Sequence, residues 1–193
     1  MPLSSRRGKG TSVSRLILVT GGARSGKSRF ARQMAEQGNG GPRLFIATAV
    51  GCDADMRRRI ARHRRERDAR WATLEESARL PERLPARHLC PGGILLFDCL
   101  PTFVTNLLLS KQSPSAIRSR VRAILKACRR PGVTALFVSN EVGLGLVPDH
   151  PLGREFRDLL GIVNQEVARS ADEVYLLVAG LPVQIKDKRR RSP

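Results

Sequence analysis

The sequence contains no apolar run approaching the roughly 20 residues that a membrane-spanning helix needs, and its basic first 15 residues lack the apolar stretch of a secretory signal. Its four cysteines form no C-x-x-C pair and show no metal-ligand spacing with the three histidines, so neither a zinc site nor a disulfide framework is indicated. These absences predict a protein of the reducing cytoplasm, with no membrane span.

Acidic and aromatic residues are also scarce. The chain has 17 Asp and Glu against 35 Lys and Arg, for a net charge of +18, and only 4% aromatic residues. Three segments, residues 1–15, 57–70 and 186–191, together carry +14 of this charge, so the net charge of the remaining chain is ordinary for a soluble enzyme. A basic nucleic-acid-binding protein is one interpretation, but no Phe or Tyr interleaves with the internal Arg cluster, which weakens the case for a base-stacking surface.

What the sequence does contain is the apolar content of a globular domain, 41% over 193 residues. We expect a basic, flexible leader (residues 1–15), a single domain (16–186) and a basic tail (187–193). Apolar, β-branched runs predict buried strands at Leu16–Thr20, Leu44–Thr48, Ile94–Asp98, Ala135–Ser139 and Val174–Val178, with a shorter one at Pro182–Lys186.

Helical spacing separates these runs. It predicts helices at Ser28–Gln37, Asp53 to about Asp68, Thr102–Leu109, Ser115–Arg129 and Leu152–Ala171. Because strands alternate with helices, the fold class is α/β, with a mainly parallel sheet that carries helices on both faces.

A phosphate-binding loop follows the first predicted strand. The strand runs directly into Gly21-Gly22-Ala23-Arg24-Ser25-Gly26-Lys27-Ser28, which is the G-x-x-x-x-G-K-S pattern in its strand–loop–helix setting. Glycines let backbone N–H groups point into a concave anion nest, and the next helix directs its positive end at the phosphates. We therefore predict that Lys27 reaches the β- and γ-phosphate oxygens of a nucleotide and that Ser28 ligates Mg²⁺.

A carboxylate for the same metal ion is expected at the end of a neighbouring buried strand. Asp98 follows four apolar residues in Ile94–Asp98, which makes it the Walker B candidate. The alternative is that Asp98 caps the helix predicted from Thr102.

Three histidines and one tryptophan remain to be placed. His63 lies among arginines, which should lower its pKa and keep a ring nitrogen free, but the residues alone equally suit a solvent-facing histidine on a charged helix. His88 and His150 suit local caps or surface positions and receive no role. Trp71 could stack on a ligand ring, although core or interface packing is the more ordinary expectation.

Several segments, in order along the chain, resemble the adenosylcobinamide kinase / adenosylcobinamide-phosphate guanylyltransferase family of cobalamin biosynthesis. The resemblance covers about Leu16 to Lys186. The segments that carry it are Leu18–Arg29, Ile46–Thr48, Arg59–Ile60 with His63, Arg67 and Trp71, Thr105–Leu107, Asn140–Gly143, Val147–Pro148, Phe156–Asp158, Gly161, Asn164–Gln165 and Ala171–Val174.

The resemblance implies a RecA-like P-loop NTPase fold, a homotrimer and two reactions. A nucleoside triphosphate, ATP or GTP, would phosphorylate adenosylcobinamide. GTP would then transfer GMP through a guanylyl-histidine to adenosylcobinamide phosphate, giving adenosylcobinamide-GDP. A P-loop ATPase that binds nucleic acid and a small-molecule kinase with an inert His63 are the alternatives; on the favoured interpretation no nucleic-acid partner is expected.

The resemblance also implies site residues. The guanylylated residue would be His63, with Lys27 as the second catalytic residue and Ser28 and Asp98 as the ligands of Mg²⁺. Two departures from the family pattern are Asp68, where many relatives have proline, and Ala49, which lacks a hydroxyl. Nucleotide contacts would come from Gly21, Gly22, Ala23, Arg24, Ser25, Gly26, Lys27, Ser28, Ala47, Thr48, Ala49, Arg64, Arg65, Glu66, Arg67, Glu75 and Asp98.

Overall fold

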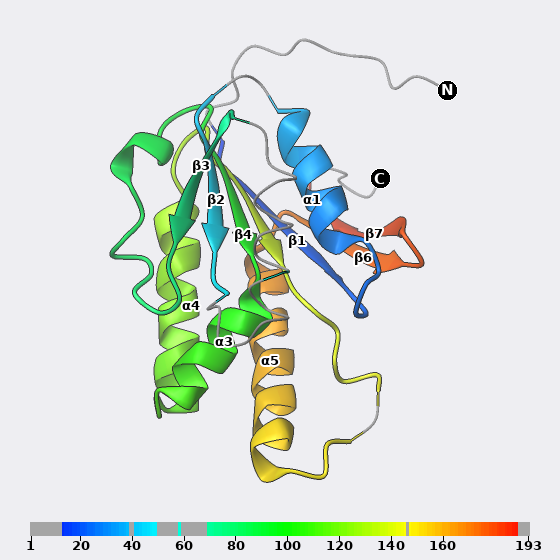
Figure 1. Cartoon of the computed structure of the whole chain (residues 1–193). Coiled ribbons are helices and arrows are strands. Elements are labelled where there is room, and N and C mark those ends of the chain that lie inside the picture. Colours follow the sequence, from blue (N-terminus) through cyan, green and yellow to red (C-terminus); the bar gives the residue numbers. More distant parts are fainter. Residues whose placement is uncertain (1–12, 39–40, 50–57, 59–68, 146, 189–193) are drawn as a thin grey trace.

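A computed structural model of the chain describes residues 13–38, 41–49, 58, 69–145 and 147–188. Within these residues seven strands form one sheet in the order β3-β2-β4-β5-β1-β6-β7, and all neighbouring pairs are parallel except β6 with β7 (Figure 1). The strands are β1 (Arg15–Gly21), β2 (Arg43–Ala47), β3 (Trp71–Glu75), β4 (Ile94–Asp98), β5 (Thr134–Val138), β6 (Glu173–Val178) and β7 (Leu181–Asp187).

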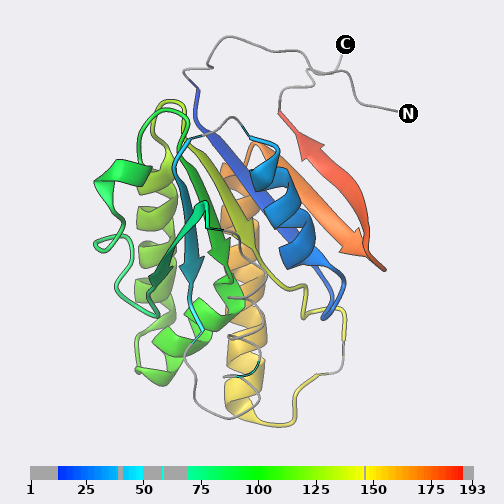
Figure 2. The same ribbon diagram turned by 45° about the horizontal axis from the view of Figure 1, so that its top comes forward.

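Helices cover both faces of this sheet, as the alternation of strands and helices predicts. α1 lies on one face, while α4 and α5 lie on the other and α3 extends from the end of β4 (Figures 1 and 2). The helices are α1 (Lys27–Glu36), α3 (Leu100–Leu109), α4 (Pro114–Cys128) and α5 (Pro151–Ser170), with a short 3-10 turn at Ala86–His88.

Alternate residues of each central strand enter two separate cores. Leu16 and Leu18 of β1 pack with α3, α4 and α5, whereas Ile17 and Val19 pack beneath α1. Both sets are almost fully buried, which explains why the strand appears in the sequence as an unbroken apolar run rather than an alternating one.

The predicted strands and helices are confirmed to within one or two residues wherever the structure describes them. The helix expected from Asp53 to Asp68 lies outside the described residues. β3 was missed: its WATLE sequence is short, lies at the sheet edge and exposes alternate residues. Trp71 begins this strand, is buried, and contacts the ring of Phe45 edge-on with centroids 6.3 Å apart, so its core role is confirmed.

Two further expectations concern local caps. His150 caps α5, because its Nδ1 accepts a hydrogen bond from the backbone N–H of Leu152 at 3.2 Å, as expected. The expectation for His88 as a cap or surface residue is wrong: it is 3% exposed within the 3-10 turn. Cys99, rather than Asp98, occupies the N-cap position of α3, so Asp98 is not a helix cap.

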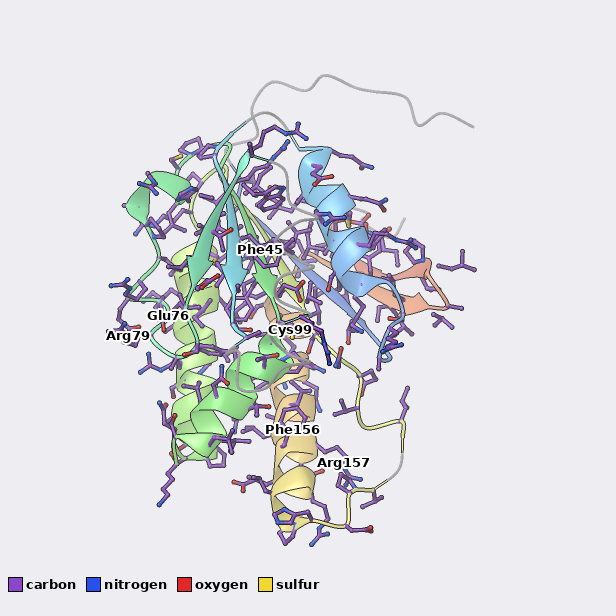
Figure 3. The ribbon with its side chains drawn as sticks, in the orientation of Figure 1. Phe45, Glu76, Arg79, Cys99, Phe156 and Arg157 are labelled. Atoms are coloured by element: carbon purple, nitrogen blue, oxygen red, sulfur yellow. The ribbon has the colours of Figure 1, made fainter. Side chains whose placement is uncertain are left out.

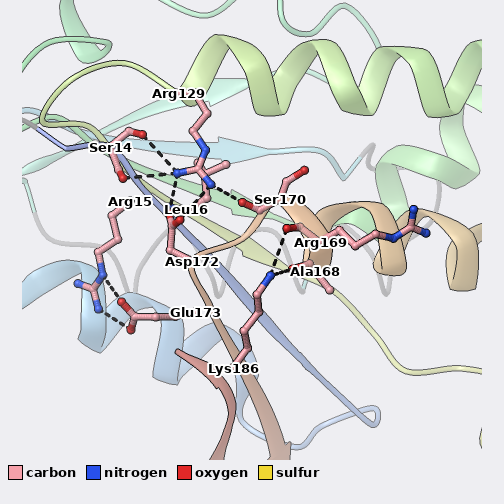
Figure 4. A network of polar contacts seen from close by, with 10 residues as sticks. All are labelled: Ser14, Arg15, Leu16, Arg129, Ala168, Arg169, Ser170, Asp172, Glu173 and Lys186. Atoms are coloured by element: carbon pink, nitrogen blue, oxygen red, sulfur yellow. Dashed lines mark hydrogen bonds and ion pairs between the residues drawn. The ribbon is translucent and has the colours of Figure 1, made fainter. Parts of the chain in front are cut away.

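A polar network joins the amino-terminal end of β1 to the ends of α4 and α5 (Figure 4). Arg129 donates to both carboxylate oxygens of Asp172 at 2.7 and 3.1 Å, and Asp172 also accepts from the backbone N–H of Leu16 at 2.8 Å. Beside it, Arg15 binds the fully buried carboxylate of Glu173 through two hydrogen bonds of 2.6 and 2.7 Å.

Among the described residues, no helix has the length and apolar character required to cross a bilayer.

Candidate functional site

The loop between β1 and α1 has a backbone conformation that favours glycine at its two turning points. Gly21 has φ 146°, and a Cβ there would lie 2.4 Å from the backbone oxygen of Leu177 in the adjacent β6. Gly26 has φ 92° and immediately precedes α1. The backbone N–H of Gly180, from the turn after β6, supports the loop by donating to the oxygen of Ser25 at 3.1 Å. The end of β6 and the turn after it therefore hold the loop in place.

Lys27, the first residue of α1, is 7% exposed and folds back over this loop. Its ammonium donates to the backbone oxygen of Gly22 at 2.5 Å and to the hydroxyl of Ser25 at 3.5 Å. Burial lowers the pKa of Lys27, and the nearby Cys99 and Asp98 partly oppose that effect. The side chain is thus held by neutral acceptors that the charged oxygens of a phosphate could replace.

Asp98 faces the same space from the end of β4. It lines a cavity of about 550 Å³ whose wall is otherwise formed mainly by the loop. The volume suffices for the phosphate groups of a nucleotide. The lining residues are Ala23, Arg24, Ser25, Gly26, Lys27, Ser28, Asp98, Cys99, Val138 and Asn140.

The two remaining loop residues of the predicted set, Gly21 and Gly22, do not line the cavity but contribute backbone acceptors beneath it. Gly22 binds Lys27, and the oxygen of Gly21 accepts from the backbone N–H of Glu141 at 3.1 Å. The structure therefore brings the whole G-x-x-x-x-G-K-S segment and Asp98 into one unit.

Thr48, at the end of β2, is fully buried, and its hydroxyl pairs with the backbone of Cys99, donating to the oxygen at 2.9 Å and accepting from the N–H at 3.0 Å. Ala47 and Ala49 flank it at the carboxyl edge of the sheet. Asn106 of α3 closes the arrangement by donating to the backbone oxygens of Thr48 and Ser77 at 2.8 and 3.2 Å. The two bonds with Cys99 therefore join the end of β2 to the end of β4, which carries Asp98, and Asn106 ties the same end of β2 to α3.

Cys99 follows Asp98 at the start of α3 (Figure 3). Burial, with a further contribution from Asp98, raises the pKa of its thiol to about 11, while a hydrogen bond with the hydroxyl of Thr102 at 3.2 Å acts in the opposite direction. The thiol is therefore neutral at physiological pH.

Glu75 ends β3 opposite Ala47 in the strand register and is exposed at the same edge of the sheet, but it does not line the cavity. His63, Arg64, Arg65, Glu66 and Arg67 lie outside the described residues. The structure thus places the phosphate-binding half of the predicted site.

Ser28 and Asp98 supply a hydroxyl and a carboxylate to one cavity, and both are oxygen groups that suit Mg²⁺. In the part of the chain that the structure describes, no three His, Cys, Asp or Glu side chains gather into a metal-binding cluster. A P-loop does not need such a cluster, because the nucleotide's phosphates complete the coordination.

Sequence reasoning gave no role to Asn140, Cys99 or Val138, although all three line the cavity. Cys99 could have been found, because it directly follows Asp98. Val138 and Asn140 belong to β5 and its end, and their place beside the loop depends on the order of the strands, which no local pattern encodes.

Comparisons with known proteins agree with this geometry. A family model described as "Cobinamide kinase / cobinamide phosphate guanyltransferase" matches residues 17–185. The chain is 40% identical over 183 residues to the bifunctional adenosylcobalamin biosynthesis protein CobU of Escherichia coli (strain K12), covering 89% of this chain and 99% of that protein. It is 41% identical over 169 residues to the bifunctional adenosylcobalamin biosynthesis protein CobP of Pseudomonas aeruginosa, covering 88% and 96%.

Solved structures with low sequence identity share the fold. The flagellar accessory protein FlaH of Methanocaldococcus jannaschii superposes with a TM-score of 0.50 at 12% identity, covering 93% of this chain and 81% of that one. The ATPase domain of G40P gives a TM-score of 0.50 at 13% identity, covering 95% and 79%. These likenesses confirm the predicted RecA-like P-loop NTPase fold.

Proposed function

The chain belongs to the cobinamide kinase / cobinamide phosphate guanyltransferase family, and on that premise we propose that it is a bifunctional enzyme that phosphorylates adenosylcobinamide and then guanylylates adenosylcobinamide phosphate. The observation that carries the proposal is the cavity in which the buried ammonium of Lys27 and the carboxylate of Asp98 face one space beside a helix N-terminus. That arrangement suits a triphosphate with a bound cation.

In the kinase step, the acceptor hydroxyl oxygen of adenosylcobinamide forms a bond to the γ-phosphorus of ATP or GTP as the bond to the bridging β–γ oxygen breaks. The loop amides hold the phosphates, and Lys27 leaves its contacts with Gly22 and Ser25 to neutralise charge on the β- and γ-oxygens. Nucleoside diphosphate leaves, and the hydroxyl proton passes to solvent or to a nearby base.

Ser28 and Asp98 would hold Mg²⁺, which supplies charge neutralisation for the phosphates when it is bound. Both residues line the cavity and present oxygen atoms.

In the guanylyl step, a neutral ring nitrogen of His63 forms a bond to the α-phosphorus of GTP as the bond from that phosphorus to the bridging α–β oxygen breaks, and the β- and γ-phosphates leave as pyrophosphate. A phosphate oxygen of adenosylcobinamide phosphate then displaces the histidine, which gives adenosylcobinamide-GDP. Arg64, Arg65 and Arg67 would offset the negative charge of the departing pyrophosphate. Glu66 is proposed only as a further nucleotide contact. Ala47, Thr48, Ala49 and Glu75 lie at the same carboxyl edge and are proposed as nucleotide contacts.

The experiment that tests this function incubates the protein with Mg²⁺ and GTP labelled either at the α- or at the γ-phosphorus. We expect label from the α-phosphorus alone to stay on the protein, and the bond to be labile in acid and stable in alkali, as a phosphorus–nitrogen bond is. His63→Ala should abolish the label and spare much of the kinase step, whereas Lys27→Ala should impair both reactions.

His150→Asn is the matched control, because His150 is exposed and asparagine also caps helices well. It should retain full labelling. If the protein phosphorylates cobinamide but retains no label, it is a small-molecule kinase without guanylyltransferase activity. If single-stranded DNA stimulates ATP hydrolysis and no phosphate passes to cobinamide, a nucleic-acid ATPase is favoured. Equal loss of both activities in His63→Ala would indicate a structural role for that residue.

The same resemblance leads us to propose a homotrimer in the cytoplasm. Light scattering on the labelled preparation, which should give three times the chain mass, checks the assembly.

A further inference from the structure

Asn140 occupies the position between the two halves of the phosphate site. β5 lies between β4, which ends in Asp98, and β1, which enters the P-loop. Val138 pairs with Asp98 on one side and with Val19 on the other. Two residues later, Asn140 leaves the carboxyl edge of the sheet and lines the cavity that Lys27 and Asp98 also line.

The backbone around Asn140 is fixed on every side. The N–H of Ser139 donates to Val19 at 2.9 Å, and the N–H of Glu141 donates to Gly21 at 3.1 Å. From α5, the side-chain amide of Asn164 donates to the backbone oxygen of Asn140 at 2.9 Å. The hydroxyl of Ser139, which is fully buried, donates to the side-chain oxygen of Asn164 at 2.5 Å.

A buried amide is costly unless its hydrogen bonds are made, and this network makes them for Asn164, which is only 8% exposed. Its effect is to hold Asn140 rigidly against the P-loop strand. The side-chain amide of Asn140, in contrast, has no hydrogen-bond partner in the described part of the chain, although the segment that carries it is firmly held. A rigid backbone with an unused donor at a phosphate site is the arrangement expected of a group that serves a ligand.

An amide also suits the charges already present. Arg24 and Lys27 contribute cations and Asp98 an anion to the cavity, so a neutral N–H donor adds a contact to a phosphoryl oxygen without changing the net charge there. The donor keeps its proton throughout, because it only stabilises charge on the oxygens while the β–γ bond breaks and the bond to the acceptor oxygen forms.

We propose that the side-chain amide of Asn140 donates to a terminal phosphoryl oxygen of the bound nucleoside triphosphate, which makes it a catalytic residue of the kinase step, and that Asn164 is the positioning residue that aims it. This inference rests on the proposed function and assigns one of its contacts. The structural alternative is that Asn140 only completes the turn after β5.

The first test compares Asn140→Ala and Asn140→Asp with the wild-type enzyme in γ-phosphoryl transfer to cobinamide. Loss of one donor to a developing phosphoryl charge should lower kcat about 100-fold in Asn140→Ala. Asn140→Asp should lose more, because its carboxylate repels the phosphate, and its loss should shrink as pH falls and the carboxyl group becomes protonated. A residue that only completes a turn would give no such pH dependence.

Nucleotide binding separates the γ-phosphate contact from general damage. We expect the Kd of GDP to stay within about twofold in Asn140→Ala, and the Kd of a non-hydrolysable GTP analogue to rise about tenfold. Gln165→Ala, an exposed change beside Asn164 on α5, is the matched control and should alter neither. Parallel weakening of GDP and analogue binding, or an unchanged kcat in Asn140→Ala, would overturn the assignment.

The positioning role is tested by a double-mutant cycle. If Asn164 acts through Asn140, Asn164→Ala alone should lower kcat about 10-fold. The double variant should then have nearly the same kcat as Asn140→Ala, whereas two independent residues would give the product of both losses. Should Asn164→Ala fail to fold, Asn164→Asp keeps the acceptor for Ser139 and removes the donor to Asn140. If the wild-type enzyme shows no kinase activity, or if that activity does not depend on Lys27, the proposed function itself is contradicted. If the kinase activity depends on Lys27 but Asn140→Ala leaves it unchanged, only this inference is contradicted.

Discussion

At the residue scale, the groups of the phosphate site differ in how far the sequence could reveal them. Lys27 and Ser28 lie in one contiguous pattern, and Asp98 ends a strand whose four preceding residues are buried, so local order suffices to predict all three. Asn140 has no such signal. Its partner Asn164 is 24 residues away on another element, and the contact exists only because of the strand order.

Thr48 shows the converse case. The resemblance predicts a nucleotide contact there, and the structure shows its hydroxyl engaged twice by the backbone of Cys99. A threonine hydroxyl can form the same hydrogen bonds with a ligand or with the backbone of a neighbouring strand, and the sequence does not distinguish these two roles. In the structure its clear effect is to hold the ends of β2 and β4 together, beside Asp98.

Cys99 gives a prediction at this scale. Its thiol pKa, raised by burial and by Asp98 from the ordinary 9.0 to about 11, implies about 100-fold less thiolate at pH 8 than an ordinary thiol has. Since thiolate is the form that reacts, we expect iodoacetamide to alkylate Cys99 about 100-fold more slowly than a cysteine tripeptide. Mass spectrometry of timed digests measures the rate, with Cys90 followed in the same digests. Equal rates for Cys99 and the tripeptide would contradict the raised thiol pKa.

At the element scale, the central strands were predictable because both of their faces are buried; of the two edge strands, β3 was missed, whereas the exposed β7 was predicted. The central strands carry continuous apolar runs because α1 covers one face and α4 and α5 cover the other. β3 alternates buried and exposed residues at the sheet edge over only five positions, a signal too short to separate from a loop. Its omission also hid the placement of Glu75 opposite Ala47.

Asp172 supports a second prediction, because it joins the end of α4 to the start of β1. Burial would raise the pKa of its carboxyl group, but the hydrogen bonds from Arg129 and the backbone of Leu16 outweigh burial and leave the pKa below its ordinary value of 3.8. A lowered pKa in the folded state means that the carboxylate stabilises the fold above the ordinary pKa, and that this contribution is lost as pH falls through the folded value.

We therefore expect Asp172→Asn to lower the free energy of unfolding by about 1–3 kcal/mol at neutral pH. The difference from the wild-type protein should stay constant down to about pH 5 and narrow below about pH 4. Urea unfolding across this range measures it. Asp158→Asn is the control: that carboxylate is 67% exposed and pairs only with Arg157 in the described structure, so its removal should change little at any pH. A difference for Asp172→Asn that does not depend on pH would contradict the argument.

At the scale of the whole molecule, the residues that line the nucleotide cavity and the basic terminal segments belong to separate stretches of the sequence. All residues that line the cavity fall between positions 23 and 140, and the sheet extends from Arg15 to Asp187. Residues 1–12 and 189–193 contain six basic side chains and no acidic one, so their removal lowers the formal net charge from +18 to +12. The contacts of Ser14 with Arg129 and of Lys188 with Asp172 would remain in such a variant.

We expect the variant that lacks both segments to keep the rate of γ-phosphoryl transfer within about twofold, because the loop, Asp98 and Asn140 are untouched. It should elute from heparin at lower salt than the full chain, since fewer cations would displace counterions from the polyanion. A full-length variant with the six basic residues changed to Gln separates charge from length and should elute in the same way. A loss of more than tenfold in transfer rate by both variants would instead show that terminal charge contributes to the reaction, and a loss by the truncated variant alone would show that the terminal segments themselves complete the site.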